Sequence, residues 1–536
     1  MKMQPWLGSR LLLLLLLPLT ALPDTQSLGS EDQALMGSRG PVVVIVGAGI
    51  SGIAAAEKLH KSGLKNVKIL EATGRTGGRI HTQSFAKGLV EIGAQWIHGP
   101  SPDNIIFQLA SQFGLLGPEA LLEENQKVYV HGHPSSTPVV YSSSGRIINP
   151  EELKNATELY NTWLEEARNF TNGGCDREDS VGNYIRQKIV HSSQEWDKEF
   201  AEKNMAYLRA MLNMECCISA AHSMDYVALC PFGEYTMLPG LDCTFPKGFE
   251  SLVNRIKAPL PDGTVLLNKA VKGIHWNGSF HGDNSQVYPV KVQCEDGDSF
   301  VADHVIVTVP LGFLKKRSVD FLIPPLPPSK MQAIKNLGFG TNNKILVEFE
   351  KPFWDPNTSL IQPVWEGDSP LTEPKKDLKK NWMKKLSIFV VLEPPAQMGH
   401  VLCGFIAGEE SEFMETLTDE EIFSSMTDYF RTFTGNPELP PPISILRSQW
   451  HSHPFTGGSY SYVAVGSSGI DVDNLAEPLP TDKEAVKPLQ ILFAGEATIR
   501  NFYSTTHGAL MSGWREAQRL IDKYPEIWVT NSKAKL

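Results

Sequence analysis

An apolar run that leads directly into three spaced glycines sets narrow limits on the fold of this chain. Val42 to Val46 is an unbroken run of valine and isoleucine, which predicts a buried parallel strand. Gly47 then allows a tight turn, Gly49 lets backbone approach a pyrophosphate, and Gly52 lets a helix pack closely on the strand. We therefore expect a strand-turn-helix unit that presents a helix N-terminus to a dinucleotide.

The next strand and the turn after it make this pattern more specific. Val67 to Leu70 reads as a second strand that ends at an acid, Glu71. A carboxylate there is placed to accept hydrogen bonds from ribose hydroxyls and would repel a 2′-phosphate, so an unphosphorylated adenosine is favoured. Arg75 and Arg79 flank a Thr-Gly-Gly turn, where guanidinium groups can donate to a pyrophosphate.

These residues together resemble the FAD-dependent amine oxidases, since nicotinamide dehydrogenases share the glycines but do not usually carry the arginine-glycine turn. The far end of the chain strengthens the resemblance: a short strand at Ile491 to Phe493 precedes Glu496, and a helix opens at Thr505 and Thr506. The resemblance implies that Glu496 meets the ribityl or phosphate region and that the helix start faces the flavin ring. We therefore expect FAD as the cofactor, with the helix N-terminus stabilising charge on the reduced ring.

Between the two ends, over about residues 40–525, the resemblance narrows to the polyamine oxidases. The stretch Glu91 to Gly99 is similar to the loop at the flavin edge of these enzymes. The resemblance implies that His98 lines the substrate tunnel and positions substrate, although a lone histidine equally fits a structural role. The same loop is expected to supply four cofactor contacts: Gly93, Ala94, Gln95 and Trp96.

Lys344 is the strongest candidate for a catalytic role. The alternation after Lys344, up to Phe349, predicts a strand that carries the lysine into a pocket. The resemblance implies that this lysine holds a water against the reactive nitrogen of the flavin. A surface lysine is the alternative, because lysines are seldom buried without a specific partner.

An aromatic cluster in the last hundred residues resembles the substrate cage of amine oxidases. Tyr460 matches one wall of that cage, and Ser459 stands where monoamine oxidases have the cysteine that carries FAD, so FAD should be bound noncovalently. The second cage aromatic falls at Thr505, and Tyr503 nearby is a partial replacement. The alternative is that any of these aromatic side chains is buried only as part of the hydrophobic core.

Two further cofactor contacts and several substrate contacts complete the expected site. We expect Trp450 and the backbone of Val271 to meet the cofactor, the latter beside adenine. The 49 basic and 60 acidic side chains give a net charge of −11, which suits a cationic substrate and argues against nucleic acid as a partner. Glu215, Glu234 and Asp242 are candidate tunnel acids, with solvated surface carboxylates as the alternative.

The resemblance implies a reaction as well as a site. A hydride leaves the carbon beside an uncharged secondary amine for the flavin, the imine hydrolyses, and O2 reoxidises the flavin with release of hydrogen peroxide. The rate should rise with pH as the amine loses its proton. The expected substrates are N1-acetylspermine and N1-acetylspermidine, giving spermidine or putrescine and 3-acetamidopropanal. A spermine oxidase, a secreted L-amino-acid oxidase and a non-catalytic flavin-binding interaction protein are the alternatives.

The cofactor motifs at both ends of the chain predict two interleaved domains rather than consecutive ones. The fold class is α/β with an α+β substrate domain: a discontinuous Rossmann-like FAD-binding domain and a mixed sheet covered by helices. The expected boundaries are 40–120, 243–325 and 447–520 for the FAD-binding domain, 121–242 and 326–446 for the substrate-binding domain, 1–35 for a signal-like or dispensable extension, and 521–536 for a tail.

Local patterns add expectations within these domains. Residues 121–242 read as largely helical, Ser411 to Phe423 as one polar helix, and the Asn277-Gly278 and Asp296-Gly297 pairs as hairpin turns. No cysteine or histidine cluster has metal-ligand spacing, so no metal is expected. We also expect a monomer without a membrane span.

The two termini point to different cellular addresses. Leu11 to Leu17 is a run of leucines typical of a secretory signal and too short to span a bilayer. The chain ends in Ala534-Lys535-Leu536, close to the Ser-Lys-Leu address that a peroxisomal import receptor reads. We expect initiation at Met36 to give a peroxisomal enzyme, partly cytoplasmic, with secretion as the alternative.

Cysteines and sequons bear on the same question. The 7 cysteines form no disulfide framework in the sequence, and the adjacent Cys216 and Cys217 suit reduced thiols. Sequons suit secretion but also occur by chance, and here they stand at Asn155, Asn169, Asn277 and Asn357.

Overall fold

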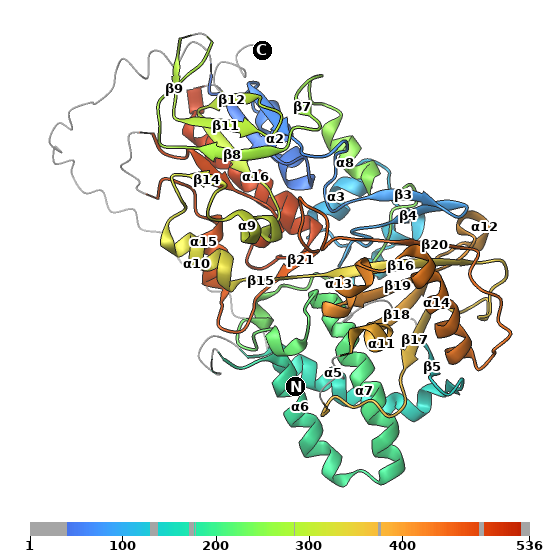
Figure 1. The fold of residues 1–536 in the computed structure, drawn as a ribbon. Helices are drawn as coiled ribbons and strands as arrows, with labels where there is room; N and C mark the ends of the chain where they lie inside the picture. The colour runs from blue at the N-terminus through green and yellow to red at the C-terminus, as the bar shows by residue number, and fades with distance from the viewer. Residues whose placement is uncertain are drawn as a thin grey trace, which may run out of the picture. The chain divides into compact units, whose positions relative to one another are not determined.

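The structure is a computed structural model, and it describes residues 40–128, 138–170, 176, 178–283, 285–372, 377–481 and 487–526 (Figure 1). The leucine run, Met36 and the C-terminal tripeptide lie outside the described residues, so the expectations for both termini stay predictions. Within the described residues, no helix is long and apolar enough to cross a membrane.

A five-stranded parallel sheet is assembled from three distant stretches of the chain. Its order is β22-β13-β1-β2-β7, and every neighbouring pair is parallel. The central strand β1 is buried along its whole length, as its unbroken apolar run predicts. The bounds are β1 (Val43–Val46), β2 (Val67–Leu70), β7 (Val265–Leu266), β13 (His304–Val307) and β22 (Ile491–Phe493).

Three helices lie beside this sheet, and α2 packs against both of the others (Figure 1). They are α2 (Ile50–Lys61), α8 (Glu250–Lys257) and α16 (Thr506–Lys523). The closeness of α2 and α16 depends on small residues, since a Cβ added to Gly513 would lie 2.1 Å from the backbone oxygen of Ser51. The first and last helices of the parallel unit therefore pack as one layer.

A second sheet has four strands in the order β12-β11-β8-β14. These strands stand close to β7 and β13 along the chain. The hairpin expected at Asp296-Gly297 is confirmed between β11 (Val290–Cys294) and β12 (Ser299–Ala302). The hairpin expected at Asn277-Gly278 is wrong, because β8 (Val271–His275) pairs with β11. The strand after the turn, β9 (Phe280–His281), pairs instead with β10 (Val287–Tyr288). At the turn, the backbone N of Asn277 donates to Gln490 Oε1 at 2.7 Å and so is not available to a partner strand of a hairpin.

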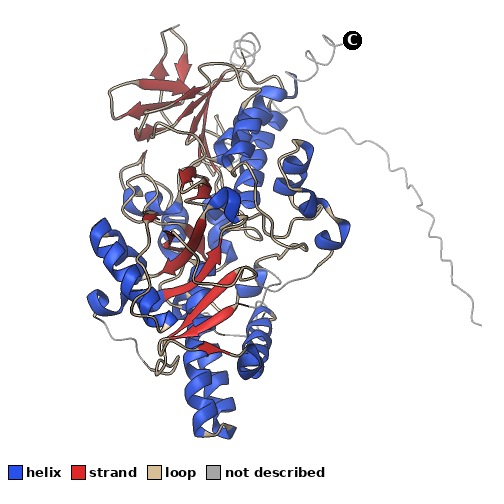
Figure 2. Ribbon diagram, turned by 90° about the vertical axis from the view of Figure 1, so that its right-hand side faces the viewer, coloured by secondary structure: helices blue, strands red, loops and turns tan. Residues whose placement is uncertain are grey.

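A seven-stranded mixed sheet, in the order β20-β16-β19-β18-β17-β5-β6, forms the second large element. All of its pairs are antiparallel except β17 with β5. Figure 2 shows the strands gathered in separate groups with helices packed against them. The bounds are β5 (Val139–Ser142), β6 (Ile147–Ile148), β16 (Asn342–Phe349), β17 (Leu360–Val364), β18 (Leu386–Val391), β19 (His400–Ala407) and β20 (Ser444–Arg447).

Helices cover this mixed sheet. The helical character expected for residues 121–242 is confirmed by α5 (Pro150–Arg168), α6 (Val181–Ser192) and α7 (Lys198–Ser219). The single helix expected from Ser411 to Phe423 is wrong: the segment contains α13 (Glu409–Glu415) and then α14 (Asp419–Thr434). Thr418 and Glu421 form a capping box at the start of α14. The sequence pattern alone did not show that α14 is separate from α13.

The remaining elements are short and connect these layers. The strands are β3 (Thr82–Phe85), β4 (Gly88–Glu91), β14 (Leu322–Ile323), β15 (Gly338–Gly340) and β21 (Tyr460–Tyr462). The helices are α3 (Ile105–Gln112), α4 (Glu123–Gln126), α9 (Leu311–Arg317), α10 (Pro328–Asn336), α11 (Leu378–Asn381), α12 (Pro395–Met398) and α15 (Gly469–Ala476).

Residues 41–536 form one compact unit by their contacts, and that unit contains both kinds of sheet that the fold class requires. The division of this unit into an FAD-binding and a substrate-binding domain stays our proposal. Cys216 and Cys217 are free, as expected, and buried. Cys230, for which the sequence offers no separate expectation, is disulfide-bonded.

Candidate active site

A cavity of about 1080 Å³ brings together nearly all of the residues that the sequence nominates. Its wall includes residues of the parallel sheet and of the seven-stranded sheet. Of the expected site residues, Gly52 and the candidate acid Glu234 do not line it; Gly52 faces the turn behind the wall. The lining contains Gly47, Gly49, Glu71, Arg75, Arg79, Gly93, Ala94, Gln95, Trp96, His98, Glu215, Val271, Lys344, Trp450, Tyr460, Glu496, Tyr503, Thr505 and Thr506.

The glycine turn after β1 leaves room for a ligand against bare backbone. Gly47 has a φ of +107°, and a Cβ on it would lie 2.6 Å from Thr308 Oγ1. A Cβ on Gly52 would lie 2.1 Å from the backbone oxygen of Gly47. At Gly49, by contrast, the nearest atom to an added Cβ is 4.0 Å away, so the space in front of it is open. The start of α2 lines the cavity at Gly49, Ile50 and Ser51, where backbone N–H groups at a helix N-terminus suit an anion.

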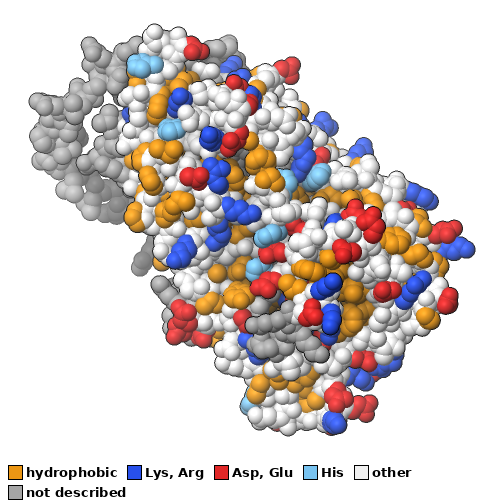
Figure 3. Space-filling view, viewed as in Figure 1, with side chains coloured by type: hydrophobic (Ala, Val, Ile, Leu, Met, Phe, Trp, Pro, Cys, Tyr) orange, Lys and Arg blue, Asp and Glu red, His pale blue; other side chains and the backbone are white. Residues whose placement is uncertain are grey.

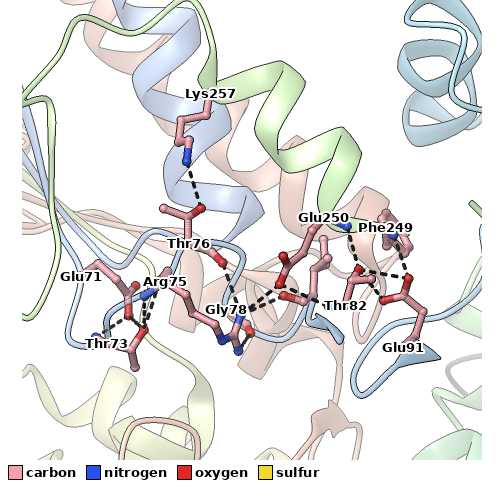
Figure 4. Close-up of polar contacts among 11 residues, drawn as sticks. Glu71, Thr73, Arg75, Thr76, Gly78, Thr82, Glu91, Phe249, Glu250 and Lys257 are labelled. Atoms are coloured by element: carbon pink, nitrogen blue, oxygen red, sulfur yellow. Dashed lines mark hydrogen bonds and ion pairs between the residues drawn. The ribbon is translucent and has the colours of Figure 1, made fainter. Parts of the chain in front are cut away.

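Glu71 and Arg75 organise the loop that borders this turn (Figure 4). Glu71 Oε2 accepts from the backbone N of Ala48 at 2.8 Å, and Oε1 accepts from the backbone N and Oγ1 of Thr73. Each carboxylate oxygen can accept further bonds, so Glu71 keeps capacity for a ribose hydroxyl. Arg75 donates to the backbone oxygens of Gly78 and Ile80, at 2.6 and 3.0 Å. In the structure, Arg75 therefore holds its own loop.

Arg79 and Glu496 meet across the sequence. Arg79 Nη1 donates to Glu496 Oε1 and to the backbone oxygen of Ser459, both at 2.8 Å. Glu496 Oε2 accepts from Ser461 Oγ at 2.5 Å and from the backbone N of Ser504 at 2.8 Å. The carboxylate expected at the ribityl or phosphate region is thus also the acceptor that ties several loops together.

Lys344 lies in β16 and is 6% exposed, so the surface-lysine alternative is wrong. Its Nζ donates to the backbone oxygens of Glu91 and Gly93 and to Gln95 Oε1, each at 2.8 Å. Burial lowers the pKa of Lys344. The three acceptors come from the loop predicted to edge the flavin, so the lysine and this loop form one structural unit.

Behind this loop lies a partly buried carboxyl, Glu91, shown at the right of Figure 4. Its oxygens accept from Thr82 Oγ1 and from the backbone N of Phe249. Burial raises the pKa of Glu91 to about 7, although these bonds and the positive charge of Lys344 oppose that rise. Glu250 lies on the other side of Thr82 and adds a like charge.

His98 faces the cavity as one half of an acid–histidine pair. Its Nδ1 and Asp242 Oδ2 are 2.7 Å apart, and the side chain keeps 44% of its surface. Burial lowers the pKa of His98, but the negative charge and hydrogen bond of Asp242 outweigh it, so the pKa is raised overall. Asp242 itself lines the cavity, as expected of a tunnel acid.

The other two candidate acids have different environments. Glu215 lines the cavity, is 3% exposed and has one oxygen without a hydrogen-bond partner among the described residues. Burial raises the pKa of Glu215, while Arg168, 3.8 Å away, opposes the rise. Glu234 does not line the cavity, because it is paired with Arg500 through two contacts of 2.7 Å. The expectation of Glu234 as a tunnel acid is therefore wrong.

The aromatic wall is held by polar contacts. Tyr460 donates its hydroxyl to the backbone oxygen of Cys217 at 2.6 Å and accepts from Asn342 Nδ2 at 2.9 Å. Tyr503 stacks edge-on against Tyr235, with ring centroids 5.6 Å apart. Thr505 is not part of an aromatic wall: its hydroxyl caps α16 by accepting from the backbone N of a residue in the first turn.

Asn342 and Phe405 are among the cavity residues that sequence reasoning missed. Asn342 lines the cavity, and its Oδ1 is buried without a hydrogen-bond partner among the described residues. Asn342 precedes Lys344 by two positions in a strand, so alternation could have placed both side chains on one face. Phe405 pairs with Lys344 across β16 and β19 and stacks on Trp96, with centroids 5.6 Å apart. No local signal marks Phe405, because its role depends on strand register.

The lining fits FAD by its chemistry. Bare backbone at Gly49, the helix starts of α2 and α16, and the acceptor Glu71 suit a dinucleotide pyrophosphate and an unphosphorylated ribose. Ser459 hydrogen-bonds the backbone of Asn342 and provides no thiol for a covalent bond. Among the described residues, no group of three or more potential metal ligands is present.

Comparison with known proteins adds an independent finding. The family model described as flavin containing amine oxidoreductase matches residues 50–521. The chain is 53% identical to "Peroxisomal N(1)-acetyl-spermine/spermidine oxidase" of Bos taurus, over 91% of this chain and 96% of that protein. It is 52% identical to the Homo sapiens protein of the same name, over 94% and 98%, and 34% identical to "Polyamine oxidase 1" of Oryza sativa subsp. japonica, over 91% and 98%.

Proposed function

Because this chain belongs to the flavin containing amine oxidoreductases, an FAD-dependent family of oxidases, we propose that it oxidises N1-acetylated polyamines. The proposed substrates are N1-acetylspermine and N1-acetylspermidine, the proposed products are spermidine or putrescine with 3-acetamidopropanal, and O2 is the electron acceptor. The observation that carries the proposal is one cavity lined by the dinucleotide cradle, Lys344, the His98–Asp242 pair and the buried acid Glu215. The names of two relatives that cover nearly the whole chain support the substrate class.

The assignment of residues to the cofactor is part of this proposal. The turn at Gly47 and Gly49 would receive the pyrophosphate, Glu71 the ribose, and the start of α16 at Thr505 and Thr506 the ring end. When bound, FAD supplies the hydride acceptor and the centre that reacts with O2. The protein's own contribution is to hold the amine, exclude water and set the charge around it.

On the substrate side, charge and hydrogen bonding suit a cationic amine with a polar end. Glu215 is buried, and its Oε1 accepts no hydrogen bond from the described residues, with Arg168 3.8 Å away, so a substrate ammonium that donates to it would satisfy both groups. Asn342 Oδ1 is a neutral acceptor in the same cavity and can receive an amide N–H. His98, with Asp242 behind it, can hold a proton near the reacting amine, which must be uncharged to react.

Spermine oxidation is the second candidate, since Glu215 and Asp242 would accept either charged end of an unacetylated substrate equally well. The two functions differ at one end of the substrate: an acetamide needs a neutral acceptor such as Asn342, whereas a second ammonium needs a carboxylate. On this proposal the two candidate functions would depend differently on Asn342 and alike on Lys344.

The test is anaerobic reduction of the purified FAD-loaded protein by N1-acetylspermine, spermine and an L-amino acid at equal concentration. Fastest loss of flavin colour with N1-acetylspermine supports the proposal. Fastest loss with spermine moves the function to spermine oxidase, and fastest loss with the amino acid moves it to an amino-acid oxidase. No loss with any of the three would leave a non-catalytic flavin-binding protein as the better description.

We propose that the protein acts in the peroxisome as a monomer, with import through Ala534-Lys535-Leu536. The word peroxisomal in the names of two relatives supports this location. Fluorescence microscopy of the chain with and without its last three residues tests it, since loss of the peroxisomal signal on removal is expected. Glycosylated, signal-cleaved material in the medium would favour secretion, and sedimentation would give the oligomeric state.

A further inference from the structure

Every hydrogen-bond donor of the Lys344 ammonium is engaged by the protein. Nζ lies 2.8 Å from each of three oxygens, which belong to the backbone of Glu91, the backbone of Gly93 and the side chain of Gln95. A charged lysine has three N–H donors and no acceptor. In this arrangement Lys344 therefore has no donor left for a molecule in the cavity that it lines.

Two of the three acceptors are fixed by the backbone. The backbone N of Ala94 donates to the backbone oxygen of Arg79 at 3.1 Å, which holds the loop between Glu91 and Gln95. A Cβ on Gly93 would lie 1.9 Å from that same oxygen, so the two backbones already touch. The carbonyls of Glu91 and Gly93 cannot turn away from Lys344 without disrupting these contacts.

The third acceptor, the side chain of Gln95, is different in kind. It lines the cavity, and its amide sits at the end of rotatable bonds. An amide offers an oxygen that accepts from an ammonium and an NH2 that can donate to a neutral amine, whereas a backbone carbonyl only accepts. Burial lowers the pKa of Lys344, which brings its neutral form closer to working pH. Neutral Lys344 keeps two N–H donors for the two carbonyls, and of the three partners only Gln95 can donate to the lone pair of its nitrogen.

We propose that Gln95 is the positioning residue of Lys344: rotation of its amide releases one Nζ donor into the cavity, and turning the amide over keeps Lys344 hydrogen-bonded when it loses its proton. This inference rests on the proposed function, because that function assigns Lys344 to the reacting end of the cavity. It adds a residue whose side chain determines when Lys344 is available.

Two other titratable groups lie near Lys344, and their titrations must be distinguished from that of Lys344. Glu91, on β4, has a pKa raised to about 7 by burial, and Cys403, on β19, has a pKa raised to about 11 by burial. Each of them attracts the charged form of Lys344 when it is itself ionised. A Glu91→Gln background identifies any transition that belongs to Glu91.

The test is a pH titration, between about pH 6 and 10, of the absorption spectrum of bound FAD in the oxidised holoenzyme. We expect a transition that disappears in Lys344→Met and survives in Glu91→Gln. Gln95→Glu should move its midpoint up by about one pH unit or more, since a carboxylate favours the ammonium. Gln95→Met, of similar length and without an acceptor for N–H, should move it down. Gln332→Glu, the same change at an exposed site in α10, is the matched control and should leave the midpoint in place.

Three results would overturn the proposal: no Lys344-dependent transition, an equal midpoint in all Gln95 variants, or a Gln95 shift that persists in the Lys344→Met background. The last comparison is a double-mutant cycle, which assigns the effect to the pair. No amine is present in the titration. A protein whose flavin no polyamine reduces would thus refute the proposed function while still giving a result on Gln95.

Discussion

Arg79 and Glu496 lie 417 positions apart in the sequence and form an ion pair of 2.8 Å in the wall of the cavity. Arg79 follows the dinucleotide turn near the start of the chain, and Glu496 follows β22 near its end. The pair therefore joins the two segments that must be together before a dinucleotide site exists. Since Glu496 is 5% exposed, the pair is largely shielded from water.

Glu496→Gln should weaken FAD retention and lower thermal stability together. The variant leaves the Arg79 guanidinium without its carboxylate partner in a buried wall, which costs on the order of 3 kcal/mol. The measurement is the flavin-to-protein absorbance ratio after gel filtration, with a melting curve of the same sample. Glu420→Gln, an exposed change in α14, is the control. Unchanged flavin content in Glu496→Gln would show that the pair is not needed for the site.

Lys344→Met should lower turnover per bound flavin by about tenfold or more, because removal of a positioned donor from an active site is costly. Lys330→Met is the matched control. Lys330 is also buried, at 2% exposure, and donates to the backbone oxygens of Asn474, Leu475 and Glu477 away from the cavity. The Lys330→Met variant should be less stable than the unmodified protein and should keep its turnover per bound flavin. Equal turnover losses in the two variants would contradict the assignment of Lys344.

Because of the Glu91 carboxyl, the free energy of unfolding should fall as pH rises. Its pKa in the folded protein is raised to about 7, above the value of about 4.3 in an unfolded chain. Between these values the folded state holds more protons than the unfolded state, so unfolding becomes easier with increasing pH. Glu91→Gln should remove this part of the pH dependence, on the order of 2 kcal/mol. Urea unfolding at several pH values measures it, and parallel curves for the two proteins would refute the assignment.

Glu215 and Glu234 show what the sequence could not decide. Both are glutamates near aromatic and apolar residues, and the sequence offers both as candidate tunnel acids, with Glu215 as the expected substrate contact. The difference comes from Arg500, which pairs with Glu234, while the partner nearest to Glu215 is Arg168 at 3.8 Å. Which carboxylate remains available depends on a contact between residues 266 positions apart, and no local pattern records such a contact.

Glu215→Gln should therefore raise KM for a polyamine by about tenfold, since an ammonium loses a charged, buried partner. Glu234→Gln is the matched control: it breaks the pair with Arg500 outside the cavity, and it should lower stability with little effect on KM. Steady-state oxygen consumption over a range of substrate concentrations separates the two. A larger KM effect at Glu234 would reverse this assignment.

The strand-turn-helix unit was predictable because it is local: the apolar run, the glycines and the helix stand within a few residues of one another, and β1 and α2 form where expected. The position of Lys344 in a strand followed in the same way from alternation. Its acceptors could not be predicted, because they depend on where the loop after β4 lies against β16. At Asn277-Gly278 the local sequence predicts a hairpin turn that does not form. There the backbone N of Asn277 bonds a residue far along the chain, Gln490.

Gly49 and Gly52 should respond differently to the same change. A Cβ on Gly52 would lie 2.1 Å from the backbone oxygen of Gly47, so Gly52→Ala must move β1 or α2 and should destabilise the protein by about 2 kcal/mol or more, with or without FAD. A Cβ on Gly49 would meet no atom closer than 4.0 Å, so Gly49→Ala should leave the stability of the flavin-free protein near that of the unmodified chain.

The same Cβ at Gly49 would project into the space that the proposed pyrophosphate needs, so Gly49→Ala should lower FAD affinity by about tenfold or more. Unfolding curves of the flavin-free proteins and FAD titrations by fluorescence give the two quantities separately. Tight FAD binding by Gly49→Ala would mean that the cofactor does not approach this turn, and a stable Gly52→Ala would mean that strand and helix can separate at no cost. The contrast between the two variants distinguishes a glycine required by the fold from one required by the ligand.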